Sequence, residues 1–216
     1  MLSLRKPYVR VQHDGVCTYG GSQMLSDIKS IRTCGCGPVA ALDTVLYLSG
    51  EQEKPIPLAE YNKKLESICR RYFPLLPPFG INGVFLAAGM NQLLRKRGLP
   101  YRASWAFSGK KFFARMEEML SRDIPVIFSV GPNFPAVWHK NKLPFYRRRA
   151  DGSFYPCNST VAHYVTATGL DPEWIRISSW GTEYYIKRDE YRQYIQKYSA
   201  NLVSNVLFLR NTRNFG

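Results

Sequence analysis

A cysteine and a histidine far apart in the chain have the residue types that nucleophilic catalysis requires. Cys36 stands directly before Gly37 and Pro38, and His163 opens a later run rich in β-branched residues. A thiolate is a strong nucleophile, but an ordinary cysteine thiol is mostly protonated at neutral pH. A neighbouring imidazole can accept the thiol proton and later return it to a leaving group. The pair therefore predicts covalent catalysis, with Cys36 as the nucleophile and His163 as the general base and acid.

The residues that follow Cys36 predict that it lies at the N-terminus of a helix. Pro38 suits the first helical turn, because its φ is already helical and its missing amide hydrogen would have had no helical partner. Gly37 leaves room for a substrate carbonyl to approach the backbone, and Gly50 is a typical stop. The free amides and the positive dipole end of such a helix stabilise an anion. We therefore expect a thiolate at Cys36, paired with an imidazolium at His163.

Plainer interpretations of these residues stay open. A free cysteine is often simply buried, and a histidine on a strand is often a core residue. His13 and His139 are rivals of His163 for the role of base. Cys34 is either a packing residue or a partner of Cys36 in a disulfide or a zinc site, but structural zinc sites use four ligands and the other cysteines are isolated. We expect no metal and no other cofactor.

Two segments resemble a known group of enzymes. Residues 36–41 read Cys-Gly-Pro-Val-Ala-Ala, and residues 163–171 read His-Tyr-Val-Thr-Ala-Thr-Gly-Leu-Asp. Both resemble the papain-like cysteine peptidases, and within them the bacterial bacteriocin-processing peptidases that remove double-glycine leaders. Residues 178–181, Ser-Ser-Trp-Gly, are similar to the Asn-Ser-Trp-Gly segment of papain. The resemblance implies a papain-like fold and hydrolysis of a peptide or amide bond through a thioester intermediate.

The chain departs from this family at two site positions. The residue that orients the imidazole is Asn or Asp in the family, and here it is Ser178, or Ser179 if the register slips by one. A serine hydroxyl accepts a hydrogen bond but carries no charge to stabilise an imidazolium. The family also places an oxyanion-binding Gln about six residues before the cysteine, where this chain has Ser30. Gln23 can take that role only if the intervening segment folds back.

These departures keep two other functions open. One is a non-catalytic papain-like module that binds a peptide or an anionic partner through its cleft and a basic rim. The other is an acyltransferase that uses the same thiol, with an amine in place of water as the acceptor.

The net charge of +14 is compatible with several kinds of partner. The densest basic cluster is Arg147-Arg148-Arg149, but no recognition helix, zinc finger or nucleic-acid aromatic motif accompanies it. We therefore expect a peptide or protein substrate and no nucleic acid. The chain shows neither a signal-peptide pattern nor an apolar run long enough to cross a membrane, and its 5 cysteines are irregularly spaced. We expect a cytoplasmic protein with reduced thiols, and the oligomeric state stays open.

The remaining pattern predicts an α+β fold in a single papain-like domain, with a helical half over about residues 1–122 and a β half over about residues 123–216. The nucleophile helix is expected to pack against an antiparallel sheet in the second half. Residues 131–157, with their prolines, are expected to form an irregular loop. Further helices are expected at 58–72, after Asn82, after Ser108 and after Asp189, and strands at 125–130, 161–170, 174–178, 183–186 and 202–209.

Overall fold

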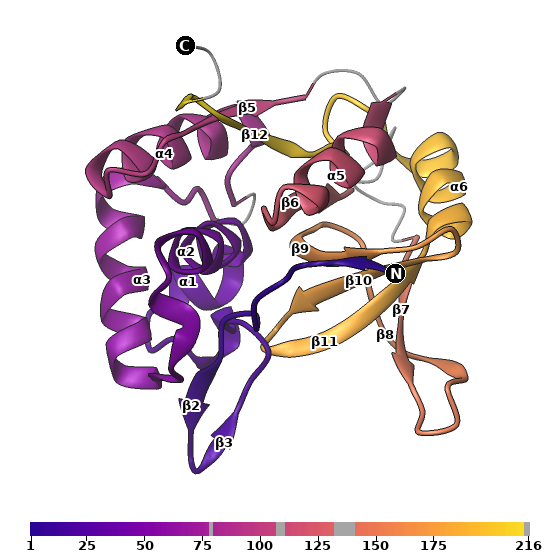
Figure 1. Ribbon diagram of the computed structural model, residues 1–216, viewed down its shortest axis with the longest axis horizontal. Coiled ribbons are helices and arrows are strands. Elements are labelled where there is room, and N and C mark those ends of the chain that lie inside the picture. Colours follow the sequence, from indigo (N-terminus) through magenta and orange to yellow (C-terminus); the bar gives the residue numbers. More distant parts are fainter. Residues whose placement is uncertain (78–79, 107–110, 132–140, 214–216) are drawn as a thin grey trace.

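The computed structural model describes residues 1–77, 80–106, 111–131 and 141–213. Figure 1 shows the helices of residues 29–96 on one side of the molecule and the main sheet on the other, with the last helix (188–198) beyond the sheet. This mixture of helices and antiparallel strands confirms the predicted α+β class. The helices are α1 (Lys29–Cys34), α2 (Cys36–Ser49), α3 (Leu58–Tyr72), α4 (Gly83–Lys96), α5 (Phe112–Ser121) and α6 (Arg188–Tyr198), with 3-10 turns η1 (Gln23–Leu25) and η2 (Glu51–Glu53).

The main sheet is antiparallel throughout and contains the strand that carries His163. Its order is β1-β9-β10-β11-β7-β8. β1 pairs with residues 169–170 of β9, and β6 pairs with residues 163–167 of the same strand. Two smaller sheets join β12 to β5 and β2 to β3 and β4. The strands are β1 (Leu2–Ser3), β2 (Val11–His13), β3 (Val16–Cys17), β4 (Ile56–Pro57), β5 (Tyr101–Trp105), β6 (Val126–Val130), β7 (Leu143–Arg148), β8 (Phe154–Thr160), β9 (His163–Leu170), β10 (Trp174–Ser179), β11 (Thr182–Lys187) and β12 (Leu207–Asn211).

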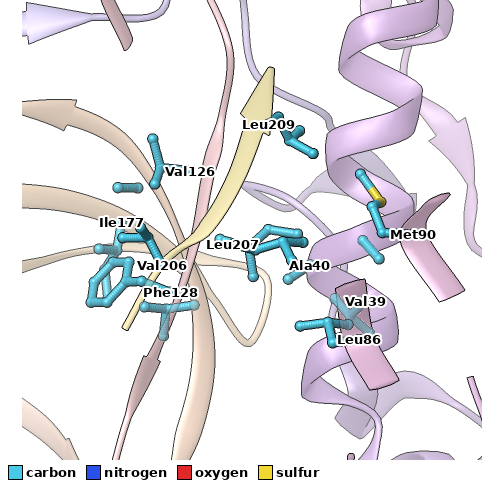
Figure 2. Close-up of a cluster of buried hydrophobic side chains, with 14 of the residues drawn as sticks. Val39, Ala40, Leu86, Met90, Val126, Phe128, Ile177, Val206, Leu207 and Leu209 are labelled. Carbon is cyan, nitrogen blue, oxygen red and sulfur yellow. The ribbon is translucent and has the colours of Figure 1, made fainter. Parts of the chain in front are cut away.

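Helix α2 is buried on almost every side, and this burial fixes the place of its N-terminus. All residues from Gly37 to Tyr47 are buried. Figure 2 shows Val39 and Ala40 of α2 near Leu86 and Met90 of α4, with Leu207 of β12 on the side toward the sheet. Apolar burial contributes roughly 25 cal/mol per Å². A helix that is buried on all its faces is held by packing on every side, so Cys36 has little freedom to move relative to the sheet.

Local signals at the helix ends were correct in two cases and wrong in one. Asn82 caps α4, with its Oδ1 accepting a hydrogen bond from the Phe85 amide at 3.0 Å. Gly50 ends α2 in the left-handed conformation, at φ 82°. Asp189 does not cap α6, because the N-cap is Lys187 and Asp189 lies in the first turn. Ser108 lies outside the described residues.

The prediction of an irregular loop over 131–157 was wrong for its second part. Residues 143–160 form a hairpin of β7 and β8, which continues the main sheet beyond β11. Pro156 sits where the register of the hairpin shifts, and β8 is the edge strand of the sheet. A proline is tolerated at an edge or a bulge, because no neighbouring strand needs its missing amide hydrogen. Residues 132–140 are outside the described part of the chain.

The predicted division into a helical half and a β half is crossed by pairing between distant segments. β1 pairs with β9, and β5, which the sequence did not reveal, pairs with β12. The last strand was expected at 202–209, but β12 runs over Leu207–Asn211 and Leu202 lies in an exposed turn. Both ends of the chain therefore contribute to the framework around the site.

Candidate active site

Cys36 is the first residue of α2, as its neighbours predicted, and its side chain is partly exposed. Burial raises the pKa of the thiol, while the backbone amides of Tyr164, Gly37 and Cys36 itself lower it. The net pKa is raised, so burial outweighs the helix terminus and the resting group is a thiol. Gly37 is itself buried, and a Cβ there would lie 2.9 Å from Ile81. Packing therefore explains this glycine better than the substrate approach that the sequence suggested.

His163 begins β9 and is buried on the side of the sheet that meets α2. Its Nε2 is hydrogen bonded to Ser179 Oγ at 2.8 Å, and its ring stacks on Trp180 with 4.4 Å between the centroids. The next residue, Tyr164, donates its amide hydrogen to the Cys36 sulfur. Cys36 and His163 also line one cavity of about 20 Å³. The structure therefore places the predicted nucleophile and base on the wall of one cavity, with His163 Nε2 engaged by Ser179.

The two groups do not form the expected ion pair at rest. Burial lowers the pKa of His163 to about 3, and burial raises that of Cys36. Both shifts favour the uncharged forms, because a charge loses its hydration in a buried site. At rest the cavity is thus lined by a neutral thiol and a neutral imidazole.

The residue that holds the imidazole is Ser179, which corrects the assignment to Ser178. Ser178 Oγ donates a hydrogen bond to the Tyr19 carbonyl at 2.7 Å. The physical reason lies in the local register: β10 has a bulge between Arg176 and Ile177, and its last residue, Ser179, pairs with Thr182 across a tight turn. The alternative register with Ser179 is therefore the one that the chain adopts.

The tight turn after Ser179 places Trp180 over the histidine. Trp180 and Gly181 both have positive φ, 49° and 72°, as a two-residue type I′ hairpin turn requires. This conformation is uncommon for a bulky residue such as Trp180. The turn is fastened to the N-terminal segment, since Gly181 donates to the Gly21 carbonyl at 3.0 Å and accepts from the Tyr19 amide at 2.9 Å. Trp180 also packs on Phe145 and so covers one face of the imidazole.

Of the two candidates for the oxyanion donor, the structure brings only Gln23 to the cavity. Helix α1 turns the chain back, so that the buried Gln23 lines the same cavity as Cys36. One amide hydrogen of its Nε2 is donated to the Arg32 carbonyl at 2.8 Å. A side-chain amide carries a second hydrogen. Ser30 lies on α1 and is not part of the cavity lining.

Asp43 is a cavity residue that the sequence reasoning missed. It follows Cys36 by two turns on α2 and is 1% exposed. Its carboxylate accepts hydrogen bonds from the Gly21 amide at 2.9 Å and from the Tyr61 hydroxyl at 2.8 Å. Burial raises its pKa to about 7. An aspartate inside the apolar pattern of 39–48 was the available signal, because a carboxyl group is rarely buried without a partner.

The other candidates lie elsewhere. His13 is on β2 beside Asp14, and His139 is outside the described residues. Cys34 is a buried thiol at the end of α1. Over the described ranges, no group of three or more His, Cys, Asp or Glu side chains could hold a metal ion. No helix in the same ranges has the length and apolar character needed to cross a membrane.

The basic triplet belongs to the β7–β8 hairpin, which Figure 1 shows at one edge of the main sheet, and none of its arginines lines the cavity. Arg147, Arg148 and Arg149 lie over the rings of Tyr184, Phe154 and Tyr155, at 5.8, 6.0 and 4.7 Å from the ring centroids. These cation–π contacts occur at exposed positions, where each contributes roughly 0.5–1 kcal/mol. The triplet therefore does not form a basic rim on the Cys36 cavity.

Comparison with known proteins gives no assignment. No protein-family model matches the chain, and no curated protein sequence matches it.

Proposed function

We propose that the protein is a papain-like cysteine hydrolase that cleaves a peptide or amide bond through a thioester intermediate. One observation carries the proposal: Cys36 at the N-terminus of α2 and His163 at the start of β9 line a single cavity, and the ring of His163 is held by Ser179 and Trp180. The packing of a nucleophile helix against an antiparallel sheet supports the papain-like part of the proposal.

The reaction begins from the neutral pair. His163 Nδ1 takes the thiol proton as the Cys36 sulfur attacks the substrate carbonyl carbon. The oxyanion of the tetrahedral intermediate meets the Cys36 amide and the side-chain amide of Gln23. The intermediate then collapses: the C–N bond breaks, the imidazolium protonates the leaving amine, and a thioester to Cys36 remains. Water, deprotonated by His163, attacks the thioester and releases the carboxylic acid and the free thiol.

The size of the cavity limits where a substrate lies. At about 20 Å³ the cavity has room for roughly one water molecule. A peptide must therefore lie over the partly exposed Cys36, outside the cavity, with only the reacting carbonyl directed inward.

A second candidate, a peptide-binding module without turnover, is favoured by one observation. The group on His163 Nε2 is the uncharged hydroxyl of Ser179. Such a hydroxyl orients the ring but carries no negative charge to stabilise an imidazolium. A Cys36→Ala variant separates the two candidates, since retained biological function supports binding, and a trapped uncleaved substrate supports catalysis.

An electrophilic probe tests the proposed function. The protein is treated with an epoxysuccinyl compound at pH 7, and the modified cysteines are mapped by mass spectrometry. Cys17 and Cys157 are exposed, whereas Cys36 is only partly so. Faster labelling at Cys36 than at these two thiols is expected, because a general base assists it. Labelling that follows exposure alone would contradict an activated nucleophile.

A further inference from the structure

We propose that Asp43 is a positioning residue that supplies, from inside the cavity, the negative charge that Ser179 cannot give to the His163 imidazolium. This inference rests on the proposed function and deepens it. The geometry that carries it is one shared cavity, which His163, Ser178 and Ser179 from the sheet line together with Asp43 from α2.

The carboxylate lies on the same face of α2 as the nucleophile. Cys36, Val39, Ala40 and Asp43 all line the cavity, at the i, i+3, i+4 and i+7 spacing of one helix face. The two turns between Cys36 and Asp43 correspond to about 10 Å along the helix axis. This separation weakens the repulsion between the carboxylate and a thiolate at Cys36.

The Asp43 carboxylate and the Ser178 hydroxyl both lie close to Gly20. A Cβ at Gly20 would lie 2.2 Å from Ser178 Oγ and 2.8 Å from Asp43 Oδ2, so both side chains converge on this glycine. Gly20 also has φ 79°, which disfavours any other residue. Ser178 adjoins Ser179, and Ser179 is hydrogen bonded to the imidazole.

A second connection runs through the backbone. The Gly21 amide donates to Asp43, and the Gly21 carbonyl accepts from the Gly181 amide. Gly181 follows Trp180, whose ring stacks on His163. The carboxylate thus helps to fix the turn that positions the imidazole.

The cavity can hold a negative charge, and Asp43 is its source. Within the described lining of the cavity, Asp43 is the only carboxylate, and no lysine or arginine takes part. The other titratable groups around it are the hydroxyls of Tyr61 and Tyr8, with Cys36, His163 and Tyr164 elsewhere in the cavity lining. Burial and the Asp43 charge both raise the pKa of these tyrosines, so both stay neutral. A buried imidazolium needs an opposite charge nearby, and Asp43 is the group that can provide it.

The test compares an Asp43→Asn variant with the wild type across pH 5.5 to 8.5. Because burial raises the pKa of Asp43 to about 7, the wild type is itself mostly uncharged at this residue at the acid end. We expect equal kcat in the two proteins near pH 5.5, and a kcat about tenfold lower in the variant at pH 8.5. The pH dependence of Cys36 alkylation by iodoacetamide gives a second readout that needs no substrate.

A Tyr61→Phe variant keeps the proposal testable if Asp43→Asn fails to fold. The Tyr61 hydroxyl lowers the pKa of Asp43, so its removal raises that pKa further. We expect the rise of kcat with pH to move to higher pH, with an unchanged plateau. A purely structural hydrogen bond would lower the plateau without this movement.

Asp123→Asn is the matched control. Asp123 also accepts a tyrosine hydroxyl, from Tyr47 at 2.6 Å, and a backbone amide, from Arg5 at 2.7 Å, but it does not line the cavity. Asparagine tolerates its positive φ of 61°. We expect the wild-type pH profile in this variant.

Four results would overturn the inference. A loss of kcat in Asp43→Asn that is equal at every pH would show a structural role alone, and an unchanged kcat would show no role. A Tyr61→Phe profile at the wild-type position would exclude ionisation of Asp43 as its cause. If wild-type Cys36 is alkylated no faster than Cys17 at any pH, the proposed function fails, and this inference fails with it.

Discussion

The two walls of the cavity are built in different ways. The helix wall, from Cys36 to Asp43, belongs to one continuous helix whose hydrogen bonds are local. The turn wall, residues 178–181, is held by contacts with distant segments: Tyr19 and Gly21 bind its backbone, and Phe145 packs on Trp180. The difference teaches that the proposed nucleophile, Cys36, is placed by local structure, whereas the orientation of the His163 ring depends on long-range contacts. Mutations should therefore act differently on the two walls.

The largest effect is expected on the helix wall. Cys36→Ala removes the proposed nucleophile, so turnover should fall at least about a thousandfold. The midpoint of thermal unfolding should change little, because the thiol is partly exposed. Cys17→Ala, at an exposed thiol that does not line the cavity, serves as the control. Retained turnover in Cys36→Ala would remove the basis for treating this wall as catalytic.

The second largest effect is expected at Gln23, which lines the cavity together with the helix wall. Gln23→Ala should lower kcat by about a hundredfold, because an oxyanion donor acts mainly in the transition state. KM should change much less. Ser30→Ala, the rival position on α1, should keep the wild-type kcat. Equal effects of the two substitutions would mean that neither side chain binds the oxyanion.

A stability measurement sharpens the description of the buried imidazole. The folded pKa of His163 is lowered to about 3, whereas an unfolded histidine has a pKa near 6.5. Its contribution to stability is therefore complete above pH 6.5 and is lost as the pH falls toward 3. Between pH 7 and pH 5 the wild type should lose about 2 kcal/mol of unfolding free energy that a His163→Gln variant does not lose.

Urea unfolding at the two pH values measures this difference. Both proteins keep Asp43, so its own pH dependence cancels in the comparison. His13→Gln, at a side chain that is 40% exposed, is the control and should follow the wild type. A His163→Gln variant with the wild-type pH dependence would contradict a buried neutral imidazole.

The smallest effects are expected at the two serines of the turn wall, and they should differ between activity and stability. Ser179→Ala removes the hydrogen bond to His163, so kcat/KM should fall about tenfold with little change in stability. Ser178→Ala removes the donor to the Tyr19 carbonyl, so it should cost about 1 kcal/mol of stability and change kcat/KM less. Steady-state kinetics and thermal unfolding of both variants would show the crossed pattern. The opposite pattern would restore Ser178 as the orienting residue.

The features that the sequence predicted correctly are those set by local contacts, and the features that it left open depend on long-range contacts. The start of α2 at Cys36 and its end at Gly50 were predictable, because helix termini have local signals. The strand that contains His163 was predicted from its β-branched residues, which favour strands. The choice between Ser178 and Ser179 was not settled by the sequence, since it depends on a bulge and on contacts with residues 19–21.

Two other features were missed for physical reasons. The β7–β8 hairpin has prolines that indicate a loop, and they are tolerated because β8 is an edge strand and the hairpin has a bulge. Asp43 was overlooked because its partners, the Gly21 amide and the Tyr61 hydroxyl, come from other elements. Pairings of this kind appear only when the chain is folded.

The alkylation rate of Cys36 in the wild type and in His163→Gln tests the central claim most directly. With iodoacetamide at pH 7, Cys36 of the wild type should react faster than the more exposed Cys17 and Cys157. In His163→Gln the rate at Cys36 should fall at least about tenfold, with the rates at Cys17 and Cys157 unchanged. An equal rate at Cys36 in both proteins would contradict the account, because the imidazole would then play no part in activating the thiol.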